Sequence, residues 1–402
     1  MEYGVYEFIT SWSLVLAIPA GLGLPRAVLR FISEYRVRQE WGELQGLLLS
    51  SWQFTLGVGL LLCLGATQVI SFLNLHSNFA YRPILLVAVW LVPLQALIQL
   101  QEDMARGVED IPLAYAPSKV LWPILMLGSV FFVFHQTHSL TSLLATKMAI
   151  LTLTAAIAFQ IVCLWIKFDR EIGKVRSVYK PIQWMSVAIP LLLDRTFEVF
   201  LTQIDILMVG SLLSSGDAGI YSTAAKTAVW TSFILQSLNF VAAPTYAVLH
   251  TKNNHRELQK VVSSVTLWIF VPSIVIATSL AIFAKPLLSL FGSGFLEAHW
   301  SLKVLLIGYL VDNMCGSVSN LIVMTGHQNK SALVSTFCAI LNFALNLLLI
   351  PHFGIVGAAI ATTSTMIIWN IWLSILLIKH VNINPTIFYS LGIGQDSELH
   401  AD

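Results

Sequence analysis

Charged side chains occur inside the most apolar stretches of this sequence, where an ionised group needs a partner, water or a function. Three acidic residues, Asp194, Glu198 and Asp205, are spaced by four and seven positions, so they share one face of a helix. Arg195 precedes Glu198 by three residues and is placed to pair with it. This stripe has two interpretations: an ion pair that holds helices together, or the acidic wall of a water-filled cavity.

A fourth acidic residue, Asp312, lies near the middle of another apolar stretch, and its side chain is too short to reach the membrane surface. We expect it to face a cavity, with protonation of the carboxylate as the alternative. Carboxylates at this depth suit the binding of a coupling ion, H+ or Na+. The candidates for ion coupling are Asp194, Glu198, Asp205 and Asp312.

Basic residues are candidates for binding an anionic substrate. Arg26 and Arg30 are four residues apart on one helix face at the expected inner mouth, where guanidinium groups suit a phosphate. They are equally interpretable as ordinary membrane-surface anchors. The remaining candidates lie within apolar stretches, where lysine can also extend its stem to the surface. They are Lys119, Lys147, Arg195 and Lys226, and they balance the acidic candidates, so the predicted interior is mixed in sign.

The elements that carry these groups are predicted to cross a lipid bilayer. Hydrophobic residues make up 56% of the 402-residue chain and charged residues 11%, which excludes a soluble globular protein. The net charge of +1, without any basic block, argues against nucleic acid as a partner. The fold class predicted from the sequence is an all-α, polytopic membrane helix bundle.

Cutting the chain where charges, Pro and Gly cluster between apolar runs gives eleven predicted crossings. They are approximately Tyr6–Phe31, Gly46–Leu73, Pro83–Gln101, Ile111–Phe134, Ser139–Ile166, Ile182–Leu213, Gly219–Leu249, Leu258–Phe283, Leu302–Thr325, Ser331–Ile350 and Ile355–Ile378. Lys and Arg gather in alternate loops, which indicates a cytoplasmic C-terminus and an outside N-terminus. We expect a multi-pass protein of the cytoplasmic membrane.

The basic loop at 167–181 divides the prediction into two lobes, as in transporters built from two repeats. Residues 1–166 form an N-terminal lobe of five helices, residues 182–379 a C-terminal lobe of six, and residues 380–402 a cytoplasmic tail. The sequences Gly4-Val5-Tyr6 and Gly219-Ile220-Tyr221 each begin an inward-running helix. If they are equivalent, the first helix of a six-plus-six arrangement is missing from the first lobe.

The sequence also places helix-breaking Pro and Gly residues within the predicted helices, and it lacks common enzyme motifs. The first predicted helix is interrupted by Pro19, Gly21, Gly23 and Pro25, and later helices by Pro190, Pro244 and Pro272, which allows bending. The sequence has neither a phosphate-cradling glycine loop nor a zinc-type HExxH motif. We therefore expect no enzyme activity, no metal and no cofactor.

Three stretches resemble the polysaccharide-export flippases of the multidrug/oligosaccharidyl-lipid/polysaccharide superfamily. The first is Gly4-Val5-Tyr6 followed by Gly21-Leu22-Gly23 and Arg30-Phe31-Ile32-Ser33-Glu34-Tyr35. The second runs from Pro190 through Asp205, Met208 and Gly210 to Tyr221. The third comprises Asn342, Asn346 and Leu349-Ile350-Pro351, then Gly354-Ile355-Val356-Gly357-Ala358-Ala359-Ile360-Ala361-Thr362. Among the candidates, Arg30 and Asp205 match recurring family positions best.

The resemblance implies two lobes that carry a polyprenyl-pyrophosphate-linked oligosaccharide from the inner to the outer leaflet by alternating access. It also implies a central cavity with cations for the pyrophosphate and, often, ion coupling. The expected partners are this lipid-linked oligosaccharide, membrane lipid, H+ or Na+, and other membrane proteins of polysaccharide assembly. Two alternatives stay open: a cation-coupled multidrug exporter of the same superfamily, or a membrane scaffold of polysaccharide assembly that does not transport.

Overall fold

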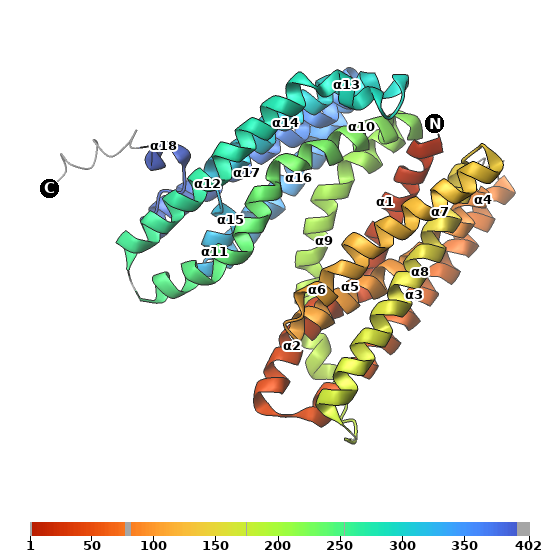
Figure 1. Cartoon of the computed structure of the whole chain (residues 1–402), viewed down its shortest axis with the longest axis horizontal. Coiled ribbons are helices and arrows are strands. Elements are labelled where there is room, and N and C mark those ends of the chain that lie inside the picture. The colour runs from red at the N-terminus through yellow and green to blue at the C-terminus, as the bar shows by residue number, and fades with distance from the viewer. Residues whose placement is uncertain (1, 77–81, 174, 253, 392–402) are drawn as a thin grey trace. The chain divides into compact units, whose positions relative to one another are not determined.

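The computed structural model describes residues 2–76, 82–173, 175–252 and 254–391, and every regular element within these ranges is a helix (Figure 1). Seven helical stretches among the described residues are long and apolar enough to cross a membrane, or up to eight if a bent pair counts as one span. The predicted all-α membrane bundle is thereby confirmed, and the chain is a multi-pass membrane protein.

The chain forms two compact units, Met1–Gln203 and Ile204–Asp402, which divide within helix α9 (Pro181–Leu212). Each of the eleven predicted segments has a helical counterpart in the described residues. The partition into five and six crossings, with a boundary at 167–181, stays a prediction. Of the predicted tail, residues 392–402 lie outside the described part of the chain.

Helices of the first unit enclose several clusters of buried apolar side chains. The elements before α9 are α1 (Glu2–Gly21), α2 (Leu24–Arg38), α3 (Trp41–His76), α4 (Arg82–Ala88), α5 (Leu91–Gly107), α6 (Ile111–Ala116), the π-helical turn η1 (Pro117–Leu121), α7 (Trp122–Thr137) and α8 (Ser142–Ile172). Helix α5 packs against α1, α2, α3 and α8, so it is the central element of this unit. Tyr35 of α2 and Trp184 of α9 are each 1% exposed in the core, where the indole Nε1 donates to the phenol oxygen at 3.0 Å.

A bend of 47° separates α1 from α2, which confirms the predicted break in the first helix. Gly23 stands at the bend with φ +71°, a left-handed conformation that glycine adopts without strain. A Cβ atom at this position would lie only 2.0 Å from the carbonyl oxygen of Ala188 in α9. Glycine therefore allows both the turn of the chain and the close approach of α2 to α9.

The second unit contains the remainder of α9 and two long antiparallel hairpins. Its other elements are α10 (Ser215–Ala228), η2 (Val229–Ser232), α11 (Phe233–Thr251), α12 (His255–Ile282), α13 (Ala284–Ser289), η3 (Ser293–Ala298), α14 (His299–Cys315), α15 (Val318–Met324), α16 (Gln328–Phe353), α17 (Ile355–Val381) and α18 (Ile387–Ser390). Helix α17 packs closely against both α14 and α16. The predicted interruption at Pro272 is wrong, because α12 runs through this residue without a break. A membrane helix tolerates the one lost N–H donor.

The turn between α16 and α17 brings their facing sides very close together. Gly354, with φ +58°, ends α16 and begins α17 at the reverse turn that the sequence predicted. Three residues later, a Cβ on Gly357 would lie 2.3 Å from the carbonyl oxygen of Leu349. Because Gly357 has no side chain, α16 and α17 lie close together at this point. Asn346 of α16 and Thr362 of α17, one to two helical turns from it, can therefore reach the same carboxylate.

Candidate functional site

A buried carboxylate surrounded by neutral hydrogen-bond donors is the main polar feature of the second unit. Asp205 of α9 is 5% exposed. Its Oδ1 accepts a hydrogen bond from Asn346 Nδ2 at 2.6 Å, and its Oδ2 accepts one from Tyr221 Oη at 3.0 Å. The Thr362 hydroxyl also donates to Oδ2. We refer to Asp205, Tyr221, Asn342, Asn346 and Thr362 as the Asp205 cluster.

Four helices build the Asp205 cluster. Tyr221 comes from α10, Asn342 and Asn346 from α16, and Thr362 from α17. Asn346 Nδ2 lies 3.0 Å from Asn342 Oδ1, one helical turn earlier, so the amide is held in place while it donates to the carboxylate. Donors that converge on a carboxylate stabilise its ionised form. The cluster is thus arranged around a single negative charge whose described contacts are all neutral.

A second carboxylate, that of Asp312 in α14, lines a cavity within the same unit. Asn370 Nδ2 of α17 donates to its Oδ1 at 3.0 Å. The cavity has a volume of about 150 Å³, and its walls include the polar residues Asn239, Ser317 and Ser319 beside Asp312 and Asn370. A cavity of this volume with polar walls has room for water or a small cation. The expectation that Asp312 faces a cavity therefore agrees with its position in the structure.

The predicted basic residues whose side chains the structure describes are half-buried or exposed. Arg26 and Arg30 both follow the bend in α2, where Arg26 is half-buried and Arg30 is exposed. The Arg30 guanidinium carbon is 5.9 Å from the ring centre of Phe31. Lys119 lies in η1 with its ammonium 3.9 Å from the Glu102 carboxylate and its side chain 68% exposed. The structure thus places Lys119 beside an acid that the sequence analysis did not consider.

Two further lysines are exposed, Lys147 in α8 and Lys226 in α10. In a membrane helix an exposed lysine fits the alternative that its stem extends along the helix to the surface. The side chains of Asp194, Arg195 and Glu198 lie outside the described part of the structure. The acidic stripe and its pairing with Arg195 therefore stay predictions.

Several functional candidates escaped the sequence analysis. Tyr221, Asn342, Asn346 and Thr362 were recognised only as parts of a resemblance, because a neutral polar residue in an apolar run carries no signal of its partners. Glu7 of α1 is 5% exposed near the start of the predicted segment Tyr6–Phe31, and the sequence analysis did not single it out.

Ion pairs gather at one end of the first unit. Lys167 Nζ lies 2.6 Å from Asp110 Oδ2, and Arg36 Nε lies 2.6 Å from Glu171 Oε1. The hydrogen bond from Lys167 holds the pKa of the Asp110 carboxyl below its ordinary value, assisted by the backbone N–H of Leu113. These pairs fix the ends of α2, α6 and α8 relative to one another within the unit.

The geometry fits binding and transport of a charged species. No group of three or more His, Cys, Asp or Glu residues able to hold a metal ion occurs in the described ranges. What the second unit offers instead is one buried carboxylate, Asp205, with amide and hydroxyl donors, and one half-buried carboxylate, Asp312, with an amide donor. Such sites, at membrane depth, are typical of proton or monovalent-cation pathways.

Known proteins share both the sequence pattern and the fold. Residues 1–250 match the family described as "Polysaccharide biosynthesis protein", and residues 190–348 match the MatE family. The chain is 25% identical over 169 residues to the probable low-salt glycan biosynthesis flippase Agl15 of Haloferax volcanii, covering 40% of this chain and 35% of that protein. It is 23% identical over 256 residues to the capsular polysaccharide biosynthesis protein CapF of Staphylococcus aureus, covering 60% of this chain and 61% of that protein.

The chain thus spans about a third to three fifths of the length of these curated relatives. A multidrug resistance MATE family transporter of the MOP superfamily, solved in an inward-facing conformation, has the same fold. It superposes with a TM-score of 0.74 at 13% identity, covering 93% of this chain and 90% of that one. Because the match over residues 1–250 exceeds half of the chain, the protein belongs to the polysaccharide biosynthesis protein family.

Proposed function

We propose that the protein is a flippase that moves a polyprenyl-pyrophosphate-linked oligosaccharide from the inner to the outer leaflet of the cytoplasmic membrane. The observation that carries this proposal is the family match over residues 1–250, together with relatives named as a glycan flippase and a capsular polysaccharide biosynthesis protein. A substrate that arrives by lateral diffusion within the bilayer needs no large extramembrane binding domain. The C-terminus is proposed to be cytoplasmic, with lysine and arginine in excess on that side.

In this proposal the two units have different chemical roles. Arg26 and Arg30 of α2 bind the pyrophosphate at the inner mouth, since the planar guanidinium group suits bidentate contact with phosphate oxygens. Asp205 and Asp312 bind the coupling cation, H+ or Na+, within the second unit. Their amide and hydroxyl neighbours are supplied by α10, α16 and α17.

The proposal is tested by reconstituting the protein in vesicles that contain a fluorescent polyprenyl-pyrophosphate oligosaccharide on one leaflet. A membrane-impermeant quencher then reports how fast the sugar reaches the other leaflet. Losing a charge-assisted contact costs about 1.5–3 kcal/mol, so Arg30→Gln is expected to slow transfer about 10- to 100-fold. Arg38→Gln is the matched control, because Arg38 lies on the same helix but pairs with Glu34 at 2.8 Å. Vesicles that redistribute the sugar no faster than protein-free vesicles would reject the flippase.

A cation-coupled drug exporter is the second candidate, and the match of residues 190–348 to the MatE family favours it. This function predicts dye efflux that is driven by a proton or sodium gradient and is abolished by Asp205→Asn. If the unsubstituted protein moves the sugar but shows no gradient-driven dye efflux, the exporter is rejected. A scaffold without transport activity is the remaining outcome, shown by polymer export that survives substitution of Arg30, Asp205 and Asp312.

A further inference from the structure

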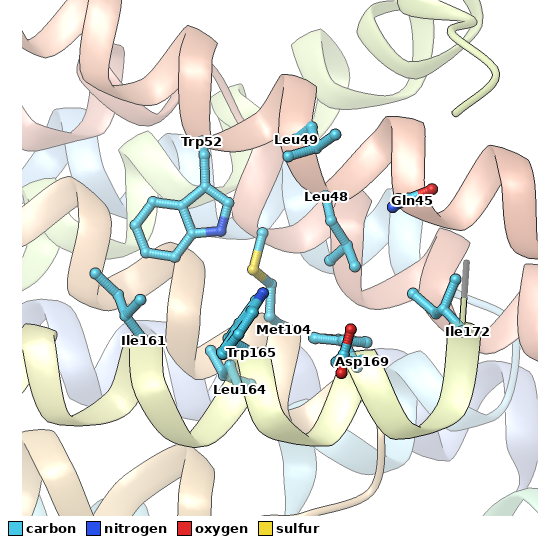
Figure 2. Close-up of a pocket in the computed structure, with 12 residues that line it drawn as sticks. Gln45, Leu48, Leu49, Trp52, Met104, Ile161, Leu164, Trp165, Asp169 and Ile172 are labelled. Atoms are coloured by element: carbon cyan, nitrogen blue, oxygen red, sulfur yellow. The ribbon is translucent and has the colours of Figure 1, made fainter. Parts of the chain in front are cut away.

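A groove of about 210 Å³ lies between α3 and α8 in the first unit, away from the residues considered above. We refer to it as the α3–α8 groove. Figure 2 shows side chains of α3, including Gln45 and Trp52, opposite side chains of α8, including Trp165 and Asp169, with Met104 of α5 between them. The groove therefore has two helical walls and a floor supplied by a third helix.

The walls of the groove are apolar and open toward the lipid. Met104 and Leu164 are 1% and 3% exposed at its base, whereas Leu49 and Trp165 at its edges are 43% and 68% exposed. Both α3 and α8 are long, apolar spans, so side chains exposed along them face hydrocarbon. The volume is smaller than the roughly 300 Å³ that accommodates a drug-sized ligand. It fits a segment of one acyl chain together with part of a headgroup.

One end of the groove is polar and holds two acceptor groups that have no donor among the described residues. In the described residues the Asp169 carboxylate forms no ion pair or hydrogen bond, and Gln45 Oε1 is buried without a donor. Asp169 also lies in the last turn of α8, which ends at Ile172, where the helix dipole adds to the negative potential. Two acceptors and a helix C-terminus together call for a cation that carries N–H donors.

The described cations closest to Asp169 along α8 and its partner helix are engaged elsewhere or point away. Arg36 pairs with Glu171 at 2.6 Å, and Lys167 pairs with Asp110 at 2.6 Å. Arg170 follows Asp169 directly and therefore points about 100° away around the helix. Since no cation is paired with Asp169 among the described residues, a ligand that carries a positive charge fits the polar end of the groove.

From this geometry we infer that the α3–α8 groove binds a phospholipid with a primary ammonium headgroup, phosphatidylethanolamine. Its ammonium donates hydrogen bonds to the Asp169 carboxylate and Gln45 Oε1, and one acyl chain lies along Trp52, Met104 and Trp165. The three N–H donors distinguish this headgroup from phosphatidylcholine, whose quaternary ammonium has none. Its positive charge distinguishes it from phosphatidylglycerol, which would bring only negative charge and hydroxyl groups to a carboxylate.

The test is native mass spectrometry of the full chain in detergent, titrated with phosphatidylethanolamine, phosphatidylcholine or phosphatidylglycerol of identical acyl chains. We expect one phosphatidylethanolamine to bind with an apparent Kd about tenfold lower than that of the other two lipids, as a charge-assisted hydrogen bond allows. Asp169→Asn should remove this preference, and Gln45→Met should reduce it. Glu40→Gln is the matched control, because it removes one carboxylate from the loop between α2 and α3 without touching the groove.

Equal binding of the three lipids, or a preference that Asp169→Asn leaves unchanged, would overturn the inference and reduce the groove to ordinary lipid contact. Competition by a polyprenyl phosphate with the ethanolamine lipid would also overturn it, because the groove would then bind the tail of the transported substrate. Binding is measured without transport, so a failed flippase assay leaves this experiment fully interpretable. Circular dichroism of each variant verifies that the helices are retained.

Discussion

Replacing Gly23 with alanine tests the bend between α1 and α2, which carries Arg26 and Arg30. The left-handed conformation at φ +71° costs a residue with a Cβ atom about 1 kcal/mol. The new Cβ would lie 2.0 Å from Ala188 O, so α2 and α9 must separate by about 1.4 Å to restore an ordinary contact of 3.4 Å. Overpacking of this kind costs about 1–3 kcal/mol. We therefore expect Gly23→Ala to lower the free energy of unfolding by about 2–4 kcal/mol.

Two other glycines separate the two contributions. Gly326 has φ +82° but open space at its Cβ position, so Gly326→Ala should lose only about 1 kcal/mol. Gly57 lies in the middle of α3 with nothing near its Cβ position, and Gly57→Ala should leave stability unchanged or raise it slightly.

The assay is thermal unfolding of the purified protein in detergent, followed by tryptophan fluorescence. The expected order of melting temperatures is Gly57→Ala highest, then Gly326→Ala, then Gly23→Ala. If Gly23→Ala melts no lower than Gly326→Ala, the close approach of α2 to α9 plays no part in stability and the reasoning is refuted.

Three further outcomes are expected. Asp110→Asn keeps the helix cap but loses the ion pair with Lys167, so it should lower the melting temperature at neutral pH. The pKa of Asp110 is lower in the folded state than in the unfolded state. The ion pair therefore stabilises the protein fully above the ordinary carboxyl pKa of about 4, and this stabilisation is lost as the pH falls through the lowered pKa of the folded state. A difference in melting temperature that does not depend on pH would contradict this prediction. Trp184→Phe leaves the buried Tyr35 hydroxyl without its donor and should cost about 1–3 kcal/mol in chemical denaturation, and less when combined with Tyr35→Phe. Asp205→Asn places an amide among hydrogen-bond donors, so it should lower the free energy of unfolding by about 1–3 kcal/mol. The substitution should also abolish any stabilisation of the purified protein by Na+. If Na+ still stabilises the variant, Asp205 does not belong to the cation site.

The helices and their breaks were predictable because the core of a lipid bilayer offers the backbone no hydrogen-bond partners. Each apolar run long enough to span the membrane must satisfy its backbone groups internally, and it therefore becomes a helix. The bend at Gly23 and the reverse turn at Gly354 followed from residue types that favour a left-handed backbone. Pro272 was misleading, because proline removes one hydrogen bond but does not by itself end a helix inside a membrane.

The partners within the candidate site were not predictable in the same way. Asp205 was identified by the cost of burying a carboxylate, which depends on its own position alone. Asn346 and Thr362 reach it across 141 and 157 residues of sequence, and nothing local indicates those distances. Glu102 escaped notice because the predicted segment ended at Gln101, whereas α5 continues to Gly107 and brings this acid within 3.9 Å of Lys119.

The neutral surroundings of Asp205 have an electrical consequence. Because the described contacts of this carboxylate carry no compensating charge, an empty cluster has one negative charge and a cluster that holds H+ or Na+ has none. A unit charge that moves through the full membrane field gains or loses about 2.3 kcal/mol per 100 mV. The membrane voltage would thus act on the Asp205 cluster while it is empty, whereas a cluster that holds H+ or Na+ would add no net charge of its own to the movement.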